Sequence, residues 1–121
     1  MIVEVQAISI EGGDTLNRLG GAMASDPHIV GYQCGGTIRE VGDKVTDRSV
    51  GQRVVATMAH GSHAELVSAP AASTWVVPDG LDLIDAAAVG KAARRRGEIV
   101  GHVVDAVVES VLVEALELLV A

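Results

Sequence analysis

Two histidines, His60 and His63, stand three residues apart, which is a spacing that a metal-binding pair can have. Structural zinc sites use four protein ligands and catalytic sites three, and this sequence supplies no third ligand at a recognisable spacing. We therefore interpret the two histidines as part of a turn or of a solvated surface. The pattern predicts no metal site.

Glu11 and Asp14 form the one carboxylate pair that could divide the roles of general acid and general base. They lie three residues apart in a glycine-containing segment, residues 10–15, where such pairs are usually solvated. The sequence predicts a loop here. Asp14 is expected to cap the backbone of that loop.

Cys34 is the single cysteine of the 121 residues, so the chain cannot form an internal disulfide, and a reducing cytoplasm suits it. No base stands close to it in sequence, so we interpret it as a small packed side chain rather than as a reactive thiol. The formal net charge of −7 argues against binding to nucleic acids or to anionic membranes.

The elements that must position these residues are mostly strands. Alternating apolar and polar residues predict strands at residues 3–8 and 37–41, and a further strand is expected at residues 53–56. Gly35 and Gly36 allow the second strand to lie close to a neighbouring element. The length of the chain suits one domain.

Residues 81–96 predict a helix, with Asp79 or Asp82 near its start and cationic residues before Gly97 at its end. Gly90 makes a break in this helix possible. Beyond Gly97, polar residues recur every three to five positions among valines, leucines and alanines, which predicts a helix with a wide apolar face. The alternative for residues 97–104 is a strand, and acidic residues further on argue against a transmembrane span.

Residues 31–56 read GYQCGGTIREVGDKVTDRSVGQRVVA, with the pattern Gly-x-x-x-x-Gly-x-Ile-x-x-Val-Gly-x-x-Val followed by Val-Gly-x-Arg-Val. This phrase resembles the N-terminal, GroES-like domain of medium-chain dehydrogenases/reductases, and most of all the zinc-free quinone oxidoreductase branch. The segments HGSHAEL at 60–66 and WVVPDGL at 75–81 extend the resemblance. The fold class implied is mainly β with α: a truncated GroES-like β-barrel with one or two C-terminal helices.

On this resemblance, residues 1–89 form the GroES-like domain without its first strands. Residues 90–121 form a helical tail that packs on the domain or on a partner chain. Relatives continue into a dinucleotide-binding domain for NADPH, whereas this sequence contains no Gly-x-Gly-x-x-Gly fingerprint. We therefore expect no bound cofactor.

The resemblance also gives the substrate-cleft candidates. Zinc-dependent relatives hold their metal at positions that match Glu11, Tyr32 and Gln33 here, and these side chains cannot replace that ligand set. Residues 10–15, with Asp14, resemble the loop at the floor of the substrate cleft. His63 belongs to a segment that contributes to the cleft wall in relatives. No residue is assigned a catalytic or cofactor-binding role.

Two functional hypotheses follow. We favour a dimerising or small-molecule-binding module without autonomous hydride transfer. The alternative is an enzyme, either a subunit that needs a partner nucleotide domain or one that uses Glu11, Asp14, Tyr32 or His63 for cofactor-free acid/base chemistry.

A homodimer is expected because missing N-terminal strands would leave an unpaired sheet edge at residues 1–8. The apolar tail would need a cover as well, and two-fold pairing would cover both surfaces with one patch.

Overall fold

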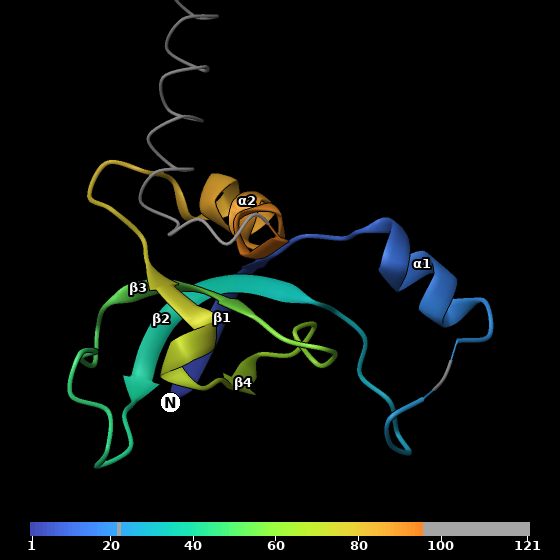
Figure 1. The fold of residues 1–121 in the computed structure, drawn as a ribbon, viewed down its shortest axis with the longest axis horizontal. Coiled ribbons are helices and arrows are strands. Elements are labelled where there is room, and N and C mark those ends of the chain that lie inside the picture. The colour runs from blue at the N-terminus through green and yellow to red at the C-terminus, as the bar shows by residue number, and fades with distance from the viewer. Residues whose placement is uncertain (22, 96–121) are drawn as a thin grey trace, which may run out of the picture.

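A curved antiparallel sheet, covered on one face by a helix, makes up most of the computed structural model, which describes residues 1–21 and 23–95 (Figure 1). The strand order is β4-β1-β2-β3-β5. This architecture confirms the expected fold class, mainly β with α. The elements in chain order are β1 (Ile2–Ile8), α1 (Gly12–Arg18), β2 (Gln33–Glu40), β3 (Arg53–Thr57), β4 (Leu66–Ser68), a 3-10 turn (Ala71–Ser73), β5 (Thr74–Val76) and α2 (Leu83–Arg95).

Strand β1 lies inside the sheet, between β2 and β4. It pairs with β2 from Ile2 to Ile8 and with β4 from Ile2 to Glu4. The unpaired edge expected at residues 1–8 is therefore wrong for Ile2 to Glu4, whereas residues 6–8 have no β4 partner. The second neighbour of β1 does not precede it but is β4, about 60 residues later in the chain.

Strand β2 is the centre of the sheet and carries two glycines where neighbours come close. A Cβ atom built on Gly36 would lie 2.1 Å from the carbonyl oxygen of Glu4 in β1. A Cβ atom on Gly35 would lie 3.0 Å from Leu83 in α2. The expectation that these glycines permit close approach is confirmed, for a strand in one case and a helix in the other.

The apolar core lies on both faces of β2 and β3. One cluster of buried side chains lies on the face away from α2, and Cys34 belongs to it, as expected for a small packed residue; its other members are Val3, Ile38, Val54, Ala56, Val67 and Ala69. The second cluster joins Val55 of β3 to Ala86 of α2 and to Val77. Burial on both faces explains why β3 reads as a continuous apolar run rather than as a strict alternation.

Helix α2 begins where Asp82 caps it, since its Oδ1 accepts a hydrogen bond from the Ile84 backbone N–H at 2.8 Å. The helix runs through Gly90 without a break. A Cβ atom at this position would lie 2.4 Å from Val55 Cγ1, so glycine lets the helix lie close to β3.

The division expected between residues 89 and 90 falls inside α2. The expected tail helix, the alternative strand at 97–104 and the cap at Gly97 lie outside the described residues.

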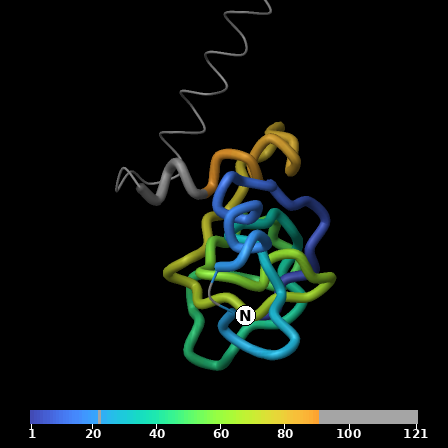
Figure 2. Tube along the Cα trace, turned by 90° about the vertical axis from the view of Figure 1, so that its right-hand side faces the viewer, coloured from blue at the N-terminus to red at the C-terminus, as the bar shows by residue number. Residues whose placement is uncertain are grey.

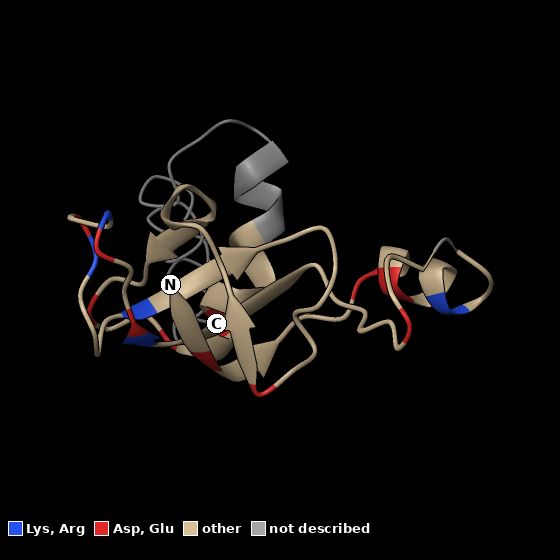
Figure 3. Ribbon diagram, turned by 90° about the horizontal axis from the view of Figure 1, so that it is seen from below, with Lys and Arg blue, Asp and Glu red and all other residues tan. Residues whose placement is uncertain are grey.

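Helix α1 projects from the sheet (Figures 1 and 3), and Figure 2, viewed along that direction, places it in front of the strands. A loop had been expected for residues 10–15, so this expectation is wrong from Gly12 onward. Gly12 and Gly13 are poor helix formers, so the sequence did not predict a helix here.

The contact between Gly36 and β1 gives a testable prediction. We expect Gly36→Ala to lower the free energy of unfolding by about 3 kcal/mol, because the added methyl group meets a backbone oxygen that a side-chain rotation cannot move. Urea unfolding followed by circular dichroism measures this.

Gly42→Ala is the matched control, because a Cβ atom there has nothing within 4 Å. Equal free energies of unfolding for the two variants would contradict the close approach of Gly36 to the Glu4 carbonyl.

Candidate functional site

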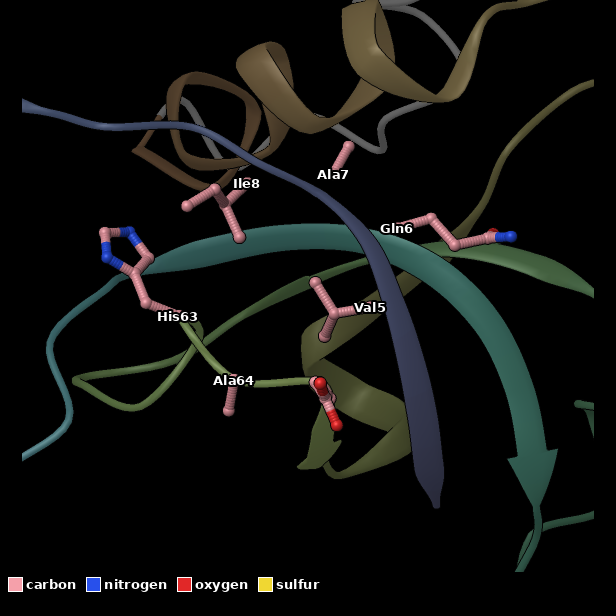
Figure 4. Close-up of a pocket in the computed structure, with 7 residues that line it drawn as sticks. Val5, Gln6, Ala7, Ile8, His63 and Ala64 are labelled. Carbon is pink, nitrogen blue, oxygen red and sulfur yellow. The ribbon is translucent and has the colours of Figure 1, made fainter.

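An open groove of about 370 Å³ lies between the second half of β1 and the segment that leads into β4 (Figure 4). It exists because β4 pairs only with the first half of β1. The hydrogen bond from the Val5 N–H to the Glu65 carbonyl, 2.8 Å long, marks the point beyond which the two segments diverge. The lining residues are Val5, Gln6, Ala7, Ile8, His63, Ala64 and Glu65.

His63 lies at the rim of the groove, with its ring beside Ile8 (Figure 4). Its backbone N–H donates to the Val30 carbonyl at 3.1 Å, and that of Ser62 donates to the Gly31 carbonyl at 3.2 Å. Gly31 has φ +109°, and a Cβ atom there would lie 2.2 Å from Ser62 Oγ and 2.4 Å from His63 Cδ2. The backbone of His63 is therefore held by these hydrogen bonds, and its imidazole ring packs against Gly31.

The polar atoms at this rim are few. Nε2 of His63 is buried and has no hydrogen-bond partner within the described part of the chain, and the same holds for Ser62 Oγ. Glu65 is exposed. The groove therefore offers apolar contact area from Val5, Ile8 and Ala64, and its polar lining groups are the Gln6 amide, one imidazole and one carboxylate.

Glu11 and Asp14 are not a solvated pair, contrary to the sequence interpretation. Asp14 is 2% exposed, and its Oδ2 accepts a hydrogen bond from the Glu11 backbone N–H at 2.8 Å. Its second oxygen, Oδ1, is buried without a partner among the described residues. Asp14 thus caps the N-terminus of α1, which agrees with the expected capping role but places it on a helix.

Tyr32 lies against the same helix N-terminus. A Cβ atom on Gly13 would lie 2.8 Å from Tyr32 Cε2, so the ring packs directly on the glycine. Gln33 points elsewhere: it is 1% exposed, and its Nε2 donates to the Ala88 carbonyl of α2 at 3.4 Å.

The structure therefore brings Glu11, Asp14 and Tyr32 together at α1. His63 lies near this group through Gly31, which precedes Tyr32 in the chain. Gln33 lies beneath α2. Of the five candidates, only His63 lines the groove. The sequence did not indicate that Val5, Gln6, Ala7 and Ile8 line a groove, because their pattern is that of an ordinary strand.

His60 does not join His63 in a site. Its ring lies 5.5 Å from that of His28, measured between centroids. Nδ1 of His28 accepts the Ala24 N–H at 3.1 Å, so Nε2 is the atom that donates to Asn17 Oδ1 at 2.9 Å. Within residues 1–21 and 23–95, no three His, Cys, Asp or Glu side chains are grouped so that they could hold a metal ion.

Cys34 is fully buried, and desolvation raises the pKa of its thiol from an ordinary 9.0 to about 11. A thiol with this pKa is protonated at neutral pH and is a poor nucleophile. The interpretation as a packing residue agrees with this environment.

No helix in the described ranges has the length and apolar character needed to cross a bilayer.

Residues 1–79 match the model of the alcohol dehydrogenase GroES-like domain, and the chain therefore belongs to this family. Its relatives include members of the quinone oxidoreductase and VAT-1 group of medium-chain dehydrogenases/reductases.

Two curated relatives show the extent of the match. The synaptic vesicle membrane protein VAT-1 homolog of Danio rerio is 32% identical over 91 residues, which are 74% of this chain and 19% of that protein. A highly reducing polyketide synthase of Didymella fabae is 36% identical over 87 residues, 72% of this chain and 4% of that protein. The chain thus spans a fifth or less of these relatives.

Solved structures give the same result. The human synaptic vesicle membrane protein VAT-1 homolog-like protein superposes with a TM-score of 0.68 at 26% identity, over 74% of this chain and 29% of that one. The Escherichia coli quinone oxidoreductase, solved in complex with NADPH, gives 0.66 at 29% identity, over 73% and 27%. The expected resemblance to a GroES-like domain is confirmed.

The burial of Cys34 gives a testable prediction. We expect the native thiol to react with Ellman's reagent at pH 7.5 about a hundredfold more slowly than in the urea-unfolded chain, because a pKa higher by two units lowers the thiolate fraction by that factor. Because the thiol ionises at a lower pH in the unfolded chain, ionisation favours the unfolded state. The contribution of the protonated Cys34 thiol to the free energy of unfolding is therefore complete below pH 9 and is lost as the pH rises towards 11. Native and unfolded rates that are equal would contradict this assignment.

Proposed function

We propose that this chain is a quinone-oxidoreductase-like GroES module that binds a small apolar molecule and does not transfer hydride by itself. The observation that carries this proposal is the groove between β1 and residues 63–65. Its volume of about 370 Å³ falls within the range of small-molecule sites, about 300–1,000 Å³.

The chemistry of the lining supports a flat, mostly apolar ligand with a carbonyl group. Val5, Ile8 and Ala64 supply apolar contact, and burial of apolar area is the main source of affinity in such sites. His63 at the rim can donate a hydrogen bond to a carbonyl oxygen through Nδ1, because its Nε2 is buried. A quinone has both features, and quinone oxidoreductases are among the relatives.

The absence of autonomous hydride transfer rests on the sequence. No Gly-x-Gly-x-x-Gly turn occurs in the 121 residues, so the chain offers no such glycine-rich helix N-terminus for a pyrophosphate. The competing function is that of an enzyme subunit whose nucleotide domain comes from a partner. The quinone oxidoreductase structure in complex with NADPH motivates this alternative.

Cofactor-free acid/base catalysis has less support. Asp14 is committed to the α1 cap, and Gln33 to a contact with α2. His63 is the remaining candidate that lines the groove. The module would work without zinc, since Tyr32 and Gln33 stand at the ligand positions, and in the cytoplasm, where the single buried thiol stays reduced.

Ligand binding in the groove is tested with duroquinone, a fully substituted quinone that does not add thiols readily. We expect titration to shift the amide NMR signals of residues 5–8 and 63–65. Ile8→Glu should weaken binding about tenfold, or 1.4 kcal/mol, because it places a charge in the apolar lining.

Val50→Glu is the matched control, since Val50 is also an exposed apolar residue and does not line the groove. Shifts confined to other residues would contradict the groove as the site. NADPH should leave the spectrum unchanged up to about 1 mM. Low-micromolar NADPH binding would instead favour the enzymatic alternative.

We also propose that the module is a homodimer. Strand β4 is an edge strand, and Leu66 on it is 59% exposed, so pairing of two copies along β4 would cover both the edge and this side chain. Sedimentation at micromolar concentration should give about twice the chain mass of 12.4 kDa. Leu66→Lys should yield a folded monomer, because the charge opposes association without disturbing the core. A monomeric native chain would overturn the dimer.

A further inference from the structure

A contact between two loop segments holds the backbone of His63 at the groove. Residues 28–31 lie before β2, and residues 60–63, which we call the rim segment, lie between β3 and β4. Two backbone hydrogen bonds, of 3.1 and 3.2 Å, join the segments, and one of them is donated by the His63 N–H. Side chains join the same two segments, because the ring centroids of His28 and His60 lie 5.5 Å apart.

His28 also connects the two segments to α1. Its Nε2 donates to Oδ1 of Asn17 in α1 at 2.9 Å, and its Nδ1 accepts the Ala24 N–H at 3.1 Å. Both bonds require a neutral ring with its proton on Nε2, since Nδ1 needs its lone pair to accept. One neutral imidazole therefore fastens α1, the loop that follows α1 and, through His60, the rim segment.

A proton added to His28 acts against these contacts. Protonated Nδ1 is a donor and would face the Ala24 N–H, which is a donor as well, so this hydrogen bond would be lost. Histidine is the side chain whose charge ordinarily changes between pH 5 and 8, and two cationic rings at a centroid separation of 5.5 Å repel each other. The contact is therefore favoured at high pH and opposed as the pH falls.

Further titratable groups lie on the segments around this ring. They are His60 and His63 on the rim segment, Glu11, Asp14 and Arg18 on or beside α1, and Asp26 on the loop itself. Arg18 and Asp26 are exposed, so solvent screens their charges. Glu11 and Asp14 belong to the start of α1, whereas Asn17 belongs to its last turn. His63 is an imidazole too, so the test has to separate its charge from that of His28.

We propose that protonation of His28 releases the rim segment and thereby weakens ligand binding in the groove. The lost bond to Ala24 and the repulsion from His60 act on the two segments that the backbone bonds join, so these bonds open more often in acid. The ring of His63 then loses its fixed place beside Ile8 (Figure 4). The effect on binding rests on the proposed function, whereas the release of the rim segment needs no ligand.

Amide hydrogen exchange of the ligand-free, full-length chain tests the release. We expect the protection factors of the Ser62 and His63 N–H groups, corrected for the intrinsic exchange rate at each pH, to fall about tenfold from pH 7.5 to pH 5.5. The N–H of Gly51, which donates to the Ile38 carbonyl at 2.8 Å, is the internal control and should keep its protection. Unchanged protection of the two rim amides would overturn the proposal.

Two variants identify the ring that responds. In His28→Gln, the protection of the two rim amides should differ less than twofold between the two pH values, because the titrating ring is gone. His63→Gln is the matched control and should keep the tenfold fall, because it retains the contacts of His28. A tenfold fall that persists in His28→Gln, or one that disappears in His63→Gln, would overturn the assignment to His28.

Duroquinone titration separates this inference from the proposed function. The native chain should bind duroquinone about tenfold more weakly at pH 5.5 than at pH 7.5, whereas the affinity of His28→Gln should be the same at both. A native affinity that does not change with pH would overturn the effect on the groove. If duroquinone binds at neither pH, the proposed function fails, and the exchange measurement still decides whether His28 releases the rim segment.

Discussion

The close contact of β2 with its neighbours is the constraint on which the rest of the structure depends. Gly36 brings the carbonyl of Glu4 within a distance that no side chain would allow, and Gly35 lets Leu83 of α2 approach more closely than it would approach most side chains. Gly90 in α2 likewise lets the helix lie close to Val55 of β3. These glycines therefore allow a short distance between the sheet and α2, and the core side chains fill the space between the two layers.

The groove follows from this arrangement and from the shortness of β4. β1 pairs with β2 from Ile2 to Ile8, with a register shift between Val5 and Ala7, but with β4 only along its first half. Its second half lies firmly in the sheet on one side and borders the groove on the other. In the proposed site, one wall is held in place by its pairing with β2, so the affinity for the proposed ligand would depend on side chains such as Ile8 and His63.

Local patterns in the sequence predicted much of the fold. Alternation located β1 and β2, and the charge pattern with Asp82 located α2, because both signals come from neighbouring residues. The position of β1 within the sheet could not be predicted in this way, since its second neighbour is distant in sequence. α1 was missed because the capping by Asp14 and the contact with Tyr32 outweigh the low helix propensity of two glycines. Of the site, a family-like segment indicated His63, whereas nothing distinguished Val5 or Ile8 from ordinary strand residues.

The pairing of β1 with β4 has a consequence for how the chain folds. The nitrogen of Met1 donates to the Ala69 carbonyl at 2.9 Å, so this contact closes a loop of 68 residues. Contacts of such sequence separation carry a high closure entropy and slow the approach to the native state. During synthesis, β1 leaves the ribosome well before β4. One side of β1 then stays without its partner until about sixty further residues have been made.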